Sequence, residues 1–171
     1  MTDLINHLLD IEKIESGNVN VNLTKTNILT MVKRVIVFNQ PQAEFKQIKL
    51  SLEISIQRHF TMTDGLVLSQ ILDNLISNAI KYSPINTTVQ IRVLKKADKI
   101  RIEIQNQGQG LTAQDQEKLF LKFSRLSAKT TANENSTGLG LYISQQLAAM
   151  LHTKINCDST ENQGATFSVE L

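Results

Sequence analysis

The chain has 171 residues, of which 41% are hydrophobic and 20% are charged, a composition that fits one globular domain with an ordinary core and a short additional segment. Its formal net charge of +2, with basic and acidic residues interspersed, and its 5% of aromatic residues argue against nucleic acid as a partner. The chain has no signal peptide, no apolar run long enough to span a bilayer and no partner for Cys157, so we expect a soluble protein of the reducing cytoplasm.

Residues 1–17 form the first predicted helix, because apolar residues recur at spacings of three and four from Met1 to Ile11. Gly17 is a typical helix stop. The wide apolar face has two interpretations. It is either the end of a longer bundle or coiled-coil helix that begins upstream, or a helix folded back onto its own domain. The pattern favours neither.

Three further segments show the period of a helix. The first begins at Asn27 and should be kinked or restarted by Pro41. The second begins at Asp64, ends before Pro84 and is the clearest helix of the chain. The third, residues 139–151, is apolar around most of its circumference and is therefore expected to be buried.

Alternating apolar and polar residues predict five strands. They are expected at residues 49–56, 88–94, 99–105, 154–157 and 165–171. The second and third form a predicted hairpin, and the last two a pair that turns at residues 162–164. With the helices, they predict an α+β fold in which a mixed, mainly antiparallel sheet of about five strands is covered by helices on one face.

A row of polar residues follows the flank of the helix that begins at Asp64. Asn74, Asn78 and Lys81 occupy positions i, i+4 and i+7, and Tyr82 lies between this row and the apolar stripe. Amide oxygens, an ammonium and a phenol in this arrangement can hold a phosphate group through Mg²⁺, which takes oxygen ligands. The alternative is an ordinary solvated flank, and the row alone does not decide between them.

Asn106 is a polar residue at a position where the alternation of the strand would place an apolar one. It follows residues 100–104, whose isoleucines alternate on one strand face, and it shares that face. Gly108 and Gly110 come directly after it, where the backbone leaves the strand. The pattern predicts a neutral amide that faces a hollow at the end of the sheet.

A second pair of glycines, Gly138 and Gly140, begins the last helix. Glycines there let a ligand approach the first backbone amides, which have no partner within the helix and suit an anion. Alternatively, Ser136 or Thr137 is the N-cap of an ordinary helix. Before this pair, residues 113–123 are briefly amphipathic, and residues 124–138 lack periodicity and predict a mobile loop or an insertion without a role.

The order of these segments resembles the catalytic, ATP-binding domain of sensor histidine kinases, in the superfamily shared with gyrase, Hsp90 and MutL. The similar motifs are the N box in NLISNAIKYS, the first glycine box in NQGQGL, the F box in LFLKFSR and the second glycine box in STGLGL. The resemblance implies the Bergerat fold, a two-layer α/β sandwich. It covers residues 19–171, with an ATP lid at about residues 112–137, whereas residues 1–18 resemble the end of the second helix of a dimerisation and phosphotransfer domain.

The resemblance also implies roles for individual residues. Asn78 matches the asparagine that ligates Mg²⁺, and Asn74 the one that lines the same site a turn earlier. Lys81 and Tyr82 match residues that contact the phosphates and sugar, and Arg125 matches a lid arginine that reaches the γ-phosphate. Asn74, Lys81 and Arg125 are therefore the expected catalytic residues.

The expected nucleotide pocket includes more residues than this catalytic set. Its glycines are expected to shape the pocket and to act as its hinges. Its residues are Asn74, Asn78, Lys81, Tyr82, Asn106, Gly108, Gly110, Leu111, Thr137, Gly138, Leu139, Gly140 and Leu141. Phe120 and Phe123, in the stretch that resembles the F box, are expected to be apolar anchors that pack the first half of the lid onto the sheet.

Asn106 stands where most relatives have an aspartate whose carboxylate accepts a hydrogen bond from the adenine amine. An amide oxygen can still accept that bond, and the amide nitrogen can donate to a ring nitrogen. One hypothesis is that Asn106 discriminates adenine from guanine less sharply than a carboxylate does. The other is that asparagine is a tolerated variant without a special role.

The expected reaction is phosphoryl transfer rather than hydrolysis. The ATPases of the superfamily have a glutamate base where this chain has Asn74, whose amide cannot take a proton near neutral pH, and Asp73 is rotated off the flank. Phosphoryl transfer depends mainly on positioning and on charge neutralisation by Mg²⁺, lysine and arginine. In bacterial two-component systems the acceptor is a histidine, and the phosphoryl group then passes to a response regulator.

No histidine here has the setting of the acceptor, because His7, His59 and His152 are followed by unrelated residues. We therefore expect the acceptor on a dimerisation domain outside this chain, in a longer homodimeric protein whose remaining part is either soluble or membrane-bound. Two alternatives are a serine kinase of the anti-sigma type with the same fold, and a catalytically inactive, nucleotide-gated interaction module.

Overall fold

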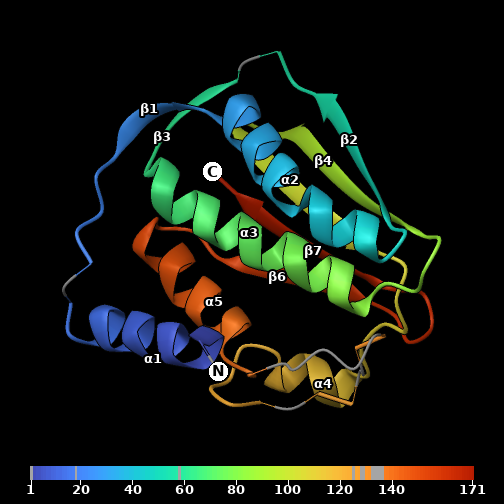
Figure 1. The fold of residues 1–171 in the computed structure, drawn as a ribbon. Helices are drawn as coiled ribbons and strands as arrows, with labels where there is room; N and C mark the ends of the chain where they lie inside the picture. The colour runs from blue at the N-terminus through green and yellow to red at the C-terminus, as the bar shows by residue number, and fades with distance from the viewer. Residues whose placement is uncertain (1, 18, 58, 125, 128–129, 132–136) are drawn as a thin grey trace.

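The computed structural model describes residues 2–17, 19–57, 59–124, 126–127, 130–131 and 137–171. Its five-stranded sheet has the order β2-β4-β5-β7-β6 (Figure 1). The strands are β2 (Lys49–Ser55), β4 (Thr88–Lys96), β5 (Lys99–Asn106), β6 (Ile155–Ser159) and β7 (Ala165–Glu170). Only β2 and β4 pair in parallel, and the other neighbours are antiparallel, so the sheet is mixed, as predicted.

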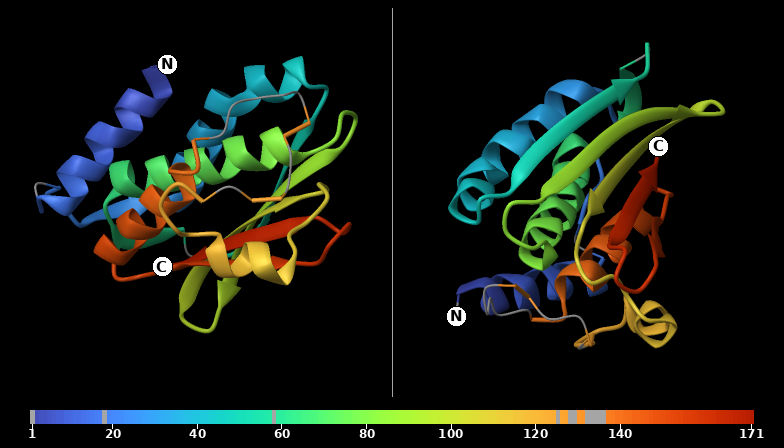
Figure 2. Two further views of the ribbon diagram at one scale, coloured as in Figure 1. Left: turned by 90° about the horizontal axis from the view of Figure 1, so that it is seen from below. Right: turned by 90° about the vertical axis from the view of Figure 1, so that its right-hand side faces the viewer.

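Helices cover one face of this sheet and leave the other face open (Figure 2). The covering helices are α2 (Ile28–Phe45), α3 (Gly65–Tyr82) and α5 (Gly140–Met150). α3 lies between the other two and buries its apolar stripe completely, for example at Leu72 and Ile76. Opposite it, Ile102 and Ile104 are fully buried. This burial is the main source of stability, because each such side chain contributes about 1.5–3 kcal/mol when removed from water.

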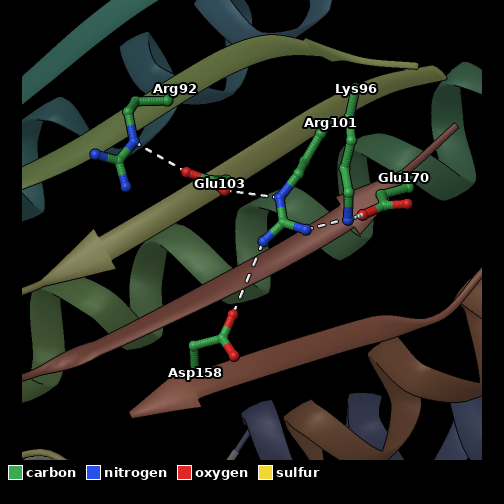
Figure 3. A network of polar contacts seen from close by, with 6 residues as sticks. All are labelled: Arg92, Lys96, Arg101, Glu103, Asp158 and Glu170. Carbon is green, nitrogen blue, oxygen red and sulfur yellow. Dashed lines mark hydrogen bonds and ion pairs between the residues drawn. The ribbon is translucent and has the colours of Figure 1, made fainter. Parts of the chain in front are cut away.

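The open face of the sheet carries alternating charges instead of apolar residues (Figure 3). Glu103 accepts from Arg92 Nε at 3.0 Å and from Arg101 Nε at 2.6 Å. Glu170 Oε1 accepts from Arg101 Nη1 at 2.8 Å and from Lys96 Nζ at 2.6 Å, and these two cations lower the pKa of Glu170. The period of two in these strands thus places the apolar residues under the helices and the charges on the opposite face, where they pair with one another.

The first helix, α1 (Thr2–Glu15), packs against α5, as the second of the two predicted interpretations requires. Ile11 is only 6% exposed and belongs to the core, so this side of the helix is folded back onto its own domain. Leu8 and Leu9 are 45% and 48% exposed. The helix ends at Gly17, whose φ of +69° favours glycine.

A second, two-stranded sheet was not predicted. It pairs β1 (Thr24–Asn27) with β3 (Phe60–Thr63) in antiparallel register, with Lys25 opposite Met62. The first strand, TKTN, has no apolar alternation, and the second, FTMT, alternates apolar and polar residues over only four positions, so the signal for strand prediction is weak in both.

Two other differences are local. Pro41 lies inside α2, which continues to Phe45, so the predicted restart was wrong; the carbonyl that loses its donor belongs to Val37, on the exposed face of the helix. The amphipathic stretch after the first glycine pair yields only α4 (Ala113–Lys118), with Thr112 as its N-cap.

Candidate functional site

The polar flank of α3 faces the beginning of α5. The Asn74 Nδ2 donates to Ser144 Oγ at 2.8 Å, and a Cβ added to Gly140 would lie 2.5 Å from Asn74 Oδ1. Only glycine therefore lets the first residue of α5 approach Asn74 so closely. The structure brings these two predicted site residues together from distant parts of the sequence.

Asn78 and Lys81 follow Asn74 along the same flank and are half-buried. Within the described residues, neither the Asn78 amide nor the Lys81 ammonium has a hydrogen-bond or ion-pair partner. Half-buried polar groups normally find partners in the protein or in water. Their carbonyl oxygen and positive charge are thus available to a ligand at the edge of the helix layer.

The first glycine box lies against the end of α3. A Cβ added to Gly108 would lie 2.4 Å from the backbone oxygen of Tyr82, so the two segments touch without room for a side chain. Gly110 has a φ of +68° and approaches the backbone of Thr160, in the turn between β6 and β7. Leu111 is buried. Tyr82 and Gly108 thus lie together, whereas Gly110 shapes the turn behind them.

Asn106 is 5% exposed and is held by backbone groups on both sides. Its Oδ1 accepts from Gly108 N at 3.0 Å and from Ala165 N at 3.3 Å. The side chain is on the helix-covered face, as its phase predicted. The oxygen, which we expected to accept from a base, already accepts two hydrogen bonds from the protein.

The second glycine box begins α5 without a side-chain cap. The N-cap position is occupied by Leu139, which is fully buried, and no side chain caps the helix. Because Leu139 is the N-cap, Thr137, whose Oγ1 accepts from Leu139 N at 3.4 Å, is not, and Ser136 lies outside the described residues. Gly138, with a φ of +67°, lies against the backbone of Ser124. The first amides of this 11-residue helix therefore keep the partial positive charge of a helix N-terminus.

The F-box segment packs differently from the prediction. Phe120 is half-buried against the core, as expected. Phe123 is 58% exposed and has a φ of +57°, so it does not anchor the lid. Leu119, at 4% exposure, is the buried anchor instead. Since α4 ends at Lys118, the helical period on which the prediction rested stops just before these residues.

Lys46 connects the segment predicted as the lid (residues 112–137) to the end of α3, and sequence reasoning missed it. Its Nζ is buried and donates to Ile80 O at 2.8 Å, to Lys81 O at 2.9 Å and to Thr131 Oγ1 at 2.8 Å. The Thr131 backbone N–H also donates to Lys81 O at 3.2 Å. A cation is favourable at a helix C-terminus, where carbonyls lack partners. In the sequence, Lys46 resembles any surface lysine.

Asp115 makes a second polar connection within the lid. It accepts from Ser127 N at 2.9 Å and from Thr112 Oγ1 at 3.0 Å, and Ser127 Oγ donates to it as well. The hydrogen bonds from Ser127 lower the pKa of this carboxyl. Asp115 was also missed, because an acidic residue in the first turn of a helix usually serves only the helix N-terminus.

The lid also contacts α1. Lys122 Nζ lies 2.5 Å from Glu15 Oε1, and the Tyr142 hydroxyl donates to the same oxygen at 3.2 Å. Leu141 next to it is half-buried. Arg125, the expected lid arginine, lies outside the described residues. Within the described residues, no group of three metal-binding acidic, histidine or cysteine side chains occurs, and no helix is long and apolar enough to cross a membrane.

Comparisons with known proteins agree with this geometry. Residues 63–171 match the family described as histidine kinase-, DNA gyrase B-, and HSP90-like ATPase. The chain is 34% identical over 173 residues to sensor histidine kinase GacS of Pseudomonas protegens, covering 98% of this chain and 19% of GacS. It is 30% identical over 171 residues to circadian input-output histidine kinase CikA of Synechococcus elongatus, covering 99% of this chain and 23% of CikA. The chain thus spans about a fifth of these relatives.

Solved structures give the same fold. The catalytic domain of histidine kinase ThkA superposes with a TM-score of 0.76 at 25% identity, and the match covers 88% of this chain and 95% of that domain. ThkA in complex with the response regulator protein TrrA matches with a TM-score of 0.78 at 21% identity, covering 99% of this chain and 48% of ThkA. The mixed sheet with helices on one face is therefore the fold of histidine kinase catalytic domains.

Proposed function

Because the chain belongs to the family of histidine kinase-, DNA gyrase B- and HSP90-like ATPases, we propose that residues 19–171 are the ATP-binding catalytic domain of a sensor histidine kinase. It transfers the γ-phosphoryl group of ATP to a histidine on a dimerisation domain, and the group then passes to a response regulator. One observation carries the proposal: the polar flank of α3, which carries Asn74, Asn78 and Lys81, meets the N-terminus of α5 at Gly140, and no described side chain caps that terminus.

The triphosphate would lie at this meeting point. The first amides of α5 and the Lys81 ammonium attract its negative charge. The half-buried Asn78 amide, which has no partner among the described residues, fits Mg²⁺, because the ion takes oxygen ligands and completes its shell with phosphate oxygens and water. When bound, Mg²⁺ neutralises charge on the phosphates. Asn74 positions this edge of the pocket through Ser144.

Transfer to a protein acceptor is favoured over hydrolysis because no general base for water is placed here. The Asn74 amide cannot take a proton near neutral pH. Asp73 accepts from Asn39 Nδ2 at 2.7 Å, and Asn39 belongs to α2, so this carboxylate is directed away from the α5 side of α3. Lys81 and the lid arginine Arg125 would stabilise the phosphates during transfer.

The acceptor and partners are proposed to lie outside the chain. Residues 1–18 would be the end of the second dimerisation helix, and the exposed Leu8 and Leu9 on α1 support a further helix partner. The full-length protein would then be a homodimer. The complex of ThkA with the response regulator protein TrrA supports a partner of that class for this chain too. The domain would work in the cytoplasm, where ATP is available, either as a soluble kinase or as part of a membrane-bound sensor.

A reconstituted transfer reaction tests the proposal. The chain is mixed with a separately produced dimerisation hairpin that contains an acceptor histidine, and with γ-labelled ATP and Mg²⁺. Acid-labile label on the hairpin is expected, and the same hairpin with its histidine replaced by alanine is the control. Label on serine of a partner would indicate the anti-sigma type of kinase. Intact ATP binding without transfer would indicate an interaction module.

A further inference from the structure

The two edges of the five-stranded sheet differ in how they are covered. At the β6 edge, Gln145 Oε1 accepts from Ile155 N at 2.9 Å and Gln116 Nε2 donates to Ser159 O at 3.1 Å, so side chains of α5 and α4 occupy backbone groups of the strand. At the β2 edge, which has seven residues and lies at the outer side of the fold (Figure 1), no described residue makes such a contact. A long, uncovered edge strand is a template for another strand.

The backbone of β2 directs alternate residues toward β4 and away from it. Lys49 N donates to Thr87 O at 3.0 Å, on the β4 side, and β2 pairs with β4 in parallel register. In a parallel ladder one residue directs both its N–H and its C=O to one side, and the next residue directs both to the other side. The backbone groups of Leu50, Leu52 and Ile54 therefore point out of the sheet, where a further strand would bind.

The side chains of β2 are incompletely covered as well. Leu50 and Leu52 pack against the core but are only half-buried, and Ile54 is 39% exposed. On the opposite face, Lys49 and Glu53 are exposed, and neither forms an ion pair within the described part of the chain. The strand thus offers an apolar row and two opposite charges to a neighbouring strand.

A second copy of this strand supplies the complement. When two copies of β2 lie antiparallel about a two-fold axis at Ser51, Lys49 of each copy lies opposite Glu53 of the other, and Leu50 lies opposite Leu52. Directly opposite residues share a face of an antiparallel pair, so apolar side chains meet apolar ones and each charge meets its opposite. Leu50 and Leu52 also direct their backbone groups outward, so they can exchange hydrogen bonds across the axis.

Other symmetric registers fit less well. An axis at Leu50 or Leu52 would place Lys49 opposite a serine, and an axis at Glu53 would place the two carboxylates opposite each other, which is destabilising. An axis between two residues would place outward-facing backbone groups opposite inward-facing ones, so no regular ladder could form. Charges on an edge strand usually oppose pairing, but in the register centred at Ser51 they favour it.

We propose that the edge of β2 is a contact between two copies of this chain, through which their sheets join into one continuous sheet. The contact is separate from the dimerisation helices proposed above, because α1 packs on α5, which contacts β6 at the opposite edge of the sheet. No nucleotide takes part in it. A single pair of short strands is smaller than a standard interface, so the dimer should be weak and should form as the protein concentration rises.

Reversal of the two charges tests the register. Lys49→Glu and Glu53→Lys each place like charges opposite one another in their own dimers, whereas a mixture of the two variants restores both opposite-charge pairs. Sedimentation over a concentration series should show self-association of the wild type and a dissociation constant raised about tenfold or more in each variant alone. The mixture should return to about the wild-type value, which also shows that both variants are folded.

Lys95→Glu and Asp98→Lys are the matched control. They make the same changes of charge at the exposed end of the hairpin formed by β4 and β5. Each should self-associate as the wild type does, and their mixture should not associate more strongly. The control thereby separates pairing at β2 from general attraction between oppositely charged proteins.

Hydrogen exchange locates the contact on the strand. In the monomer the amides of Leu50 and Leu52 face solvent, whereas those of Ser51 and Glu53 face β4. Exchange at Leu50 and Leu52 should slow as the concentration of the wild type rises, while exchange at Ser51 and Glu53 should be slow at every concentration.

Three results would overturn the proposal: a wild type that stays monomeric throughout the series, a mixture that does not recover, or self-association without slower exchange at Leu50 and Leu52. None of them bears on ATP binding or phosphoryl transfer, so the proposed function would stand.

Discussion

The junction of α3 with α5 and the neighbouring lid lie next to each other but are held together differently. At the junction, two packed helices approach so closely that Gly140 has no room for a side chain beside Asn74. The described part of the lid is anchored in the core at Leu119, and its remaining connections are a few polar contacts, chiefly those of Lys46 and Asp115. Dense packing resists deformation, whereas individual hydrogen bonds open at little cost. The phosphate side of the pocket should therefore be preformed and the lid should open independently.

The largest effect on ATP affinity is expected from breaking the packed junction. Gly140→Ala places a Cβ 2.5 Å from Asn74 Oδ1, so Asn74 has to leave Ser144. We expect the free energy of unfolding to fall by about 1–2 kcal/mol, as in other overpacked sites, and ATP affinity to fall about tenfold or more. Urea unfolding and calorimetry measure the two effects.

Gly65→Ala is the control for this substitution. Gly65 is also the first residue of a helix, but its added Cβ would meet Thr26 Cγ2 at 3.4 Å, an ordinary contact. It should change neither stability nor affinity appreciably. Normal ATP affinity of Gly140→Ala would contradict a preformed phosphate site at the junction.

An intermediate effect is expected from removing the connection between the lid and the end of α3. Lys46→Met keeps the apolar stem but removes three hydrogen bonds to Ile80 O, Lys81 O and Thr131 Oγ1. Hydrogen bonds of a charged group contribute about 1.5–3 kcal/mol, so the free energy of unfolding should fall by about 2 kcal/mol.

The lid should respond more than the rest of the fold to this change. Hydrogen exchange of the Thr131 amide is expected to accelerate in Lys46→Met, while amides of β5 change only with global stability. The exposed Lys49, on β2, supplies the control Lys49→Met. An unchanged exchange rate at Thr131 would show that the lid does not depend on Lys46.

The smallest effect is expected at Asp115. Because the hydrogen bonds from Ser127 lower its pKa in the folded state, its contribution to stability is present above its ordinary value of 3.8 and is lost as the pH falls through the lowered pKa. Asp115→Asn should be less stable than the wild type by about 1 kcal/mol at neutral pH. The difference should shrink as the pH falls below 3.8 and through the lowered pKa, because the wild-type carboxyl then becomes neutral in the folded protein too.

Urea unfolding of wild type and Asp115→Asn between pH 7 and pH 3 measures this difference. Asp98→Asn, in the exposed turn between β4 and β5, is the control and should show none of it. Equal stability of Asp115→Asn and the wild type at neutral pH would mean that the Ser127 contacts do not hold the lid.

The same contrast explains how far the sequence predicted the structure. α3 was correct at both ends because its N-cap, Asp64, and the following Pro84 are local signals. Asn74 and Gly140 belong to ordered motifs, so their meeting could be predicted. Lys46 and Asp115 could not, because their partners Thr131 and Ser127 lie in segments without periodicity. Their role depends on a tertiary position that no local pattern encodes.

Local backbone geometry explains the other differences between the predicted and the observed side-chain positions. Phe123 was expected to be an apolar anchor because it lies in the stretch that resembles the F box, but it has a positive φ and its side chain is exposed. The phase of Asn106 was predicted correctly, since strand alternation fixes the face on which a side chain lies. The direction of its amide depended on Gly108 N and Ala165 N, and the latter contact is fixed only by the pairing of β5 with β7.

Calorimetric titration of ATP into wild type and Asn78→Ala, each with and without Mg²⁺, tests the central claim most directly. If the flank of α3 and the start of α5 hold a metal-bound triphosphate, the wild type binds ATP much more tightly with Mg²⁺, and Asn78→Ala loses most of this dependence while unfolding at the same urea concentration. Mg²⁺-dependent binding that is equally strong in Asn78→Ala, or no binding by the folded wild type, would contradict the claim.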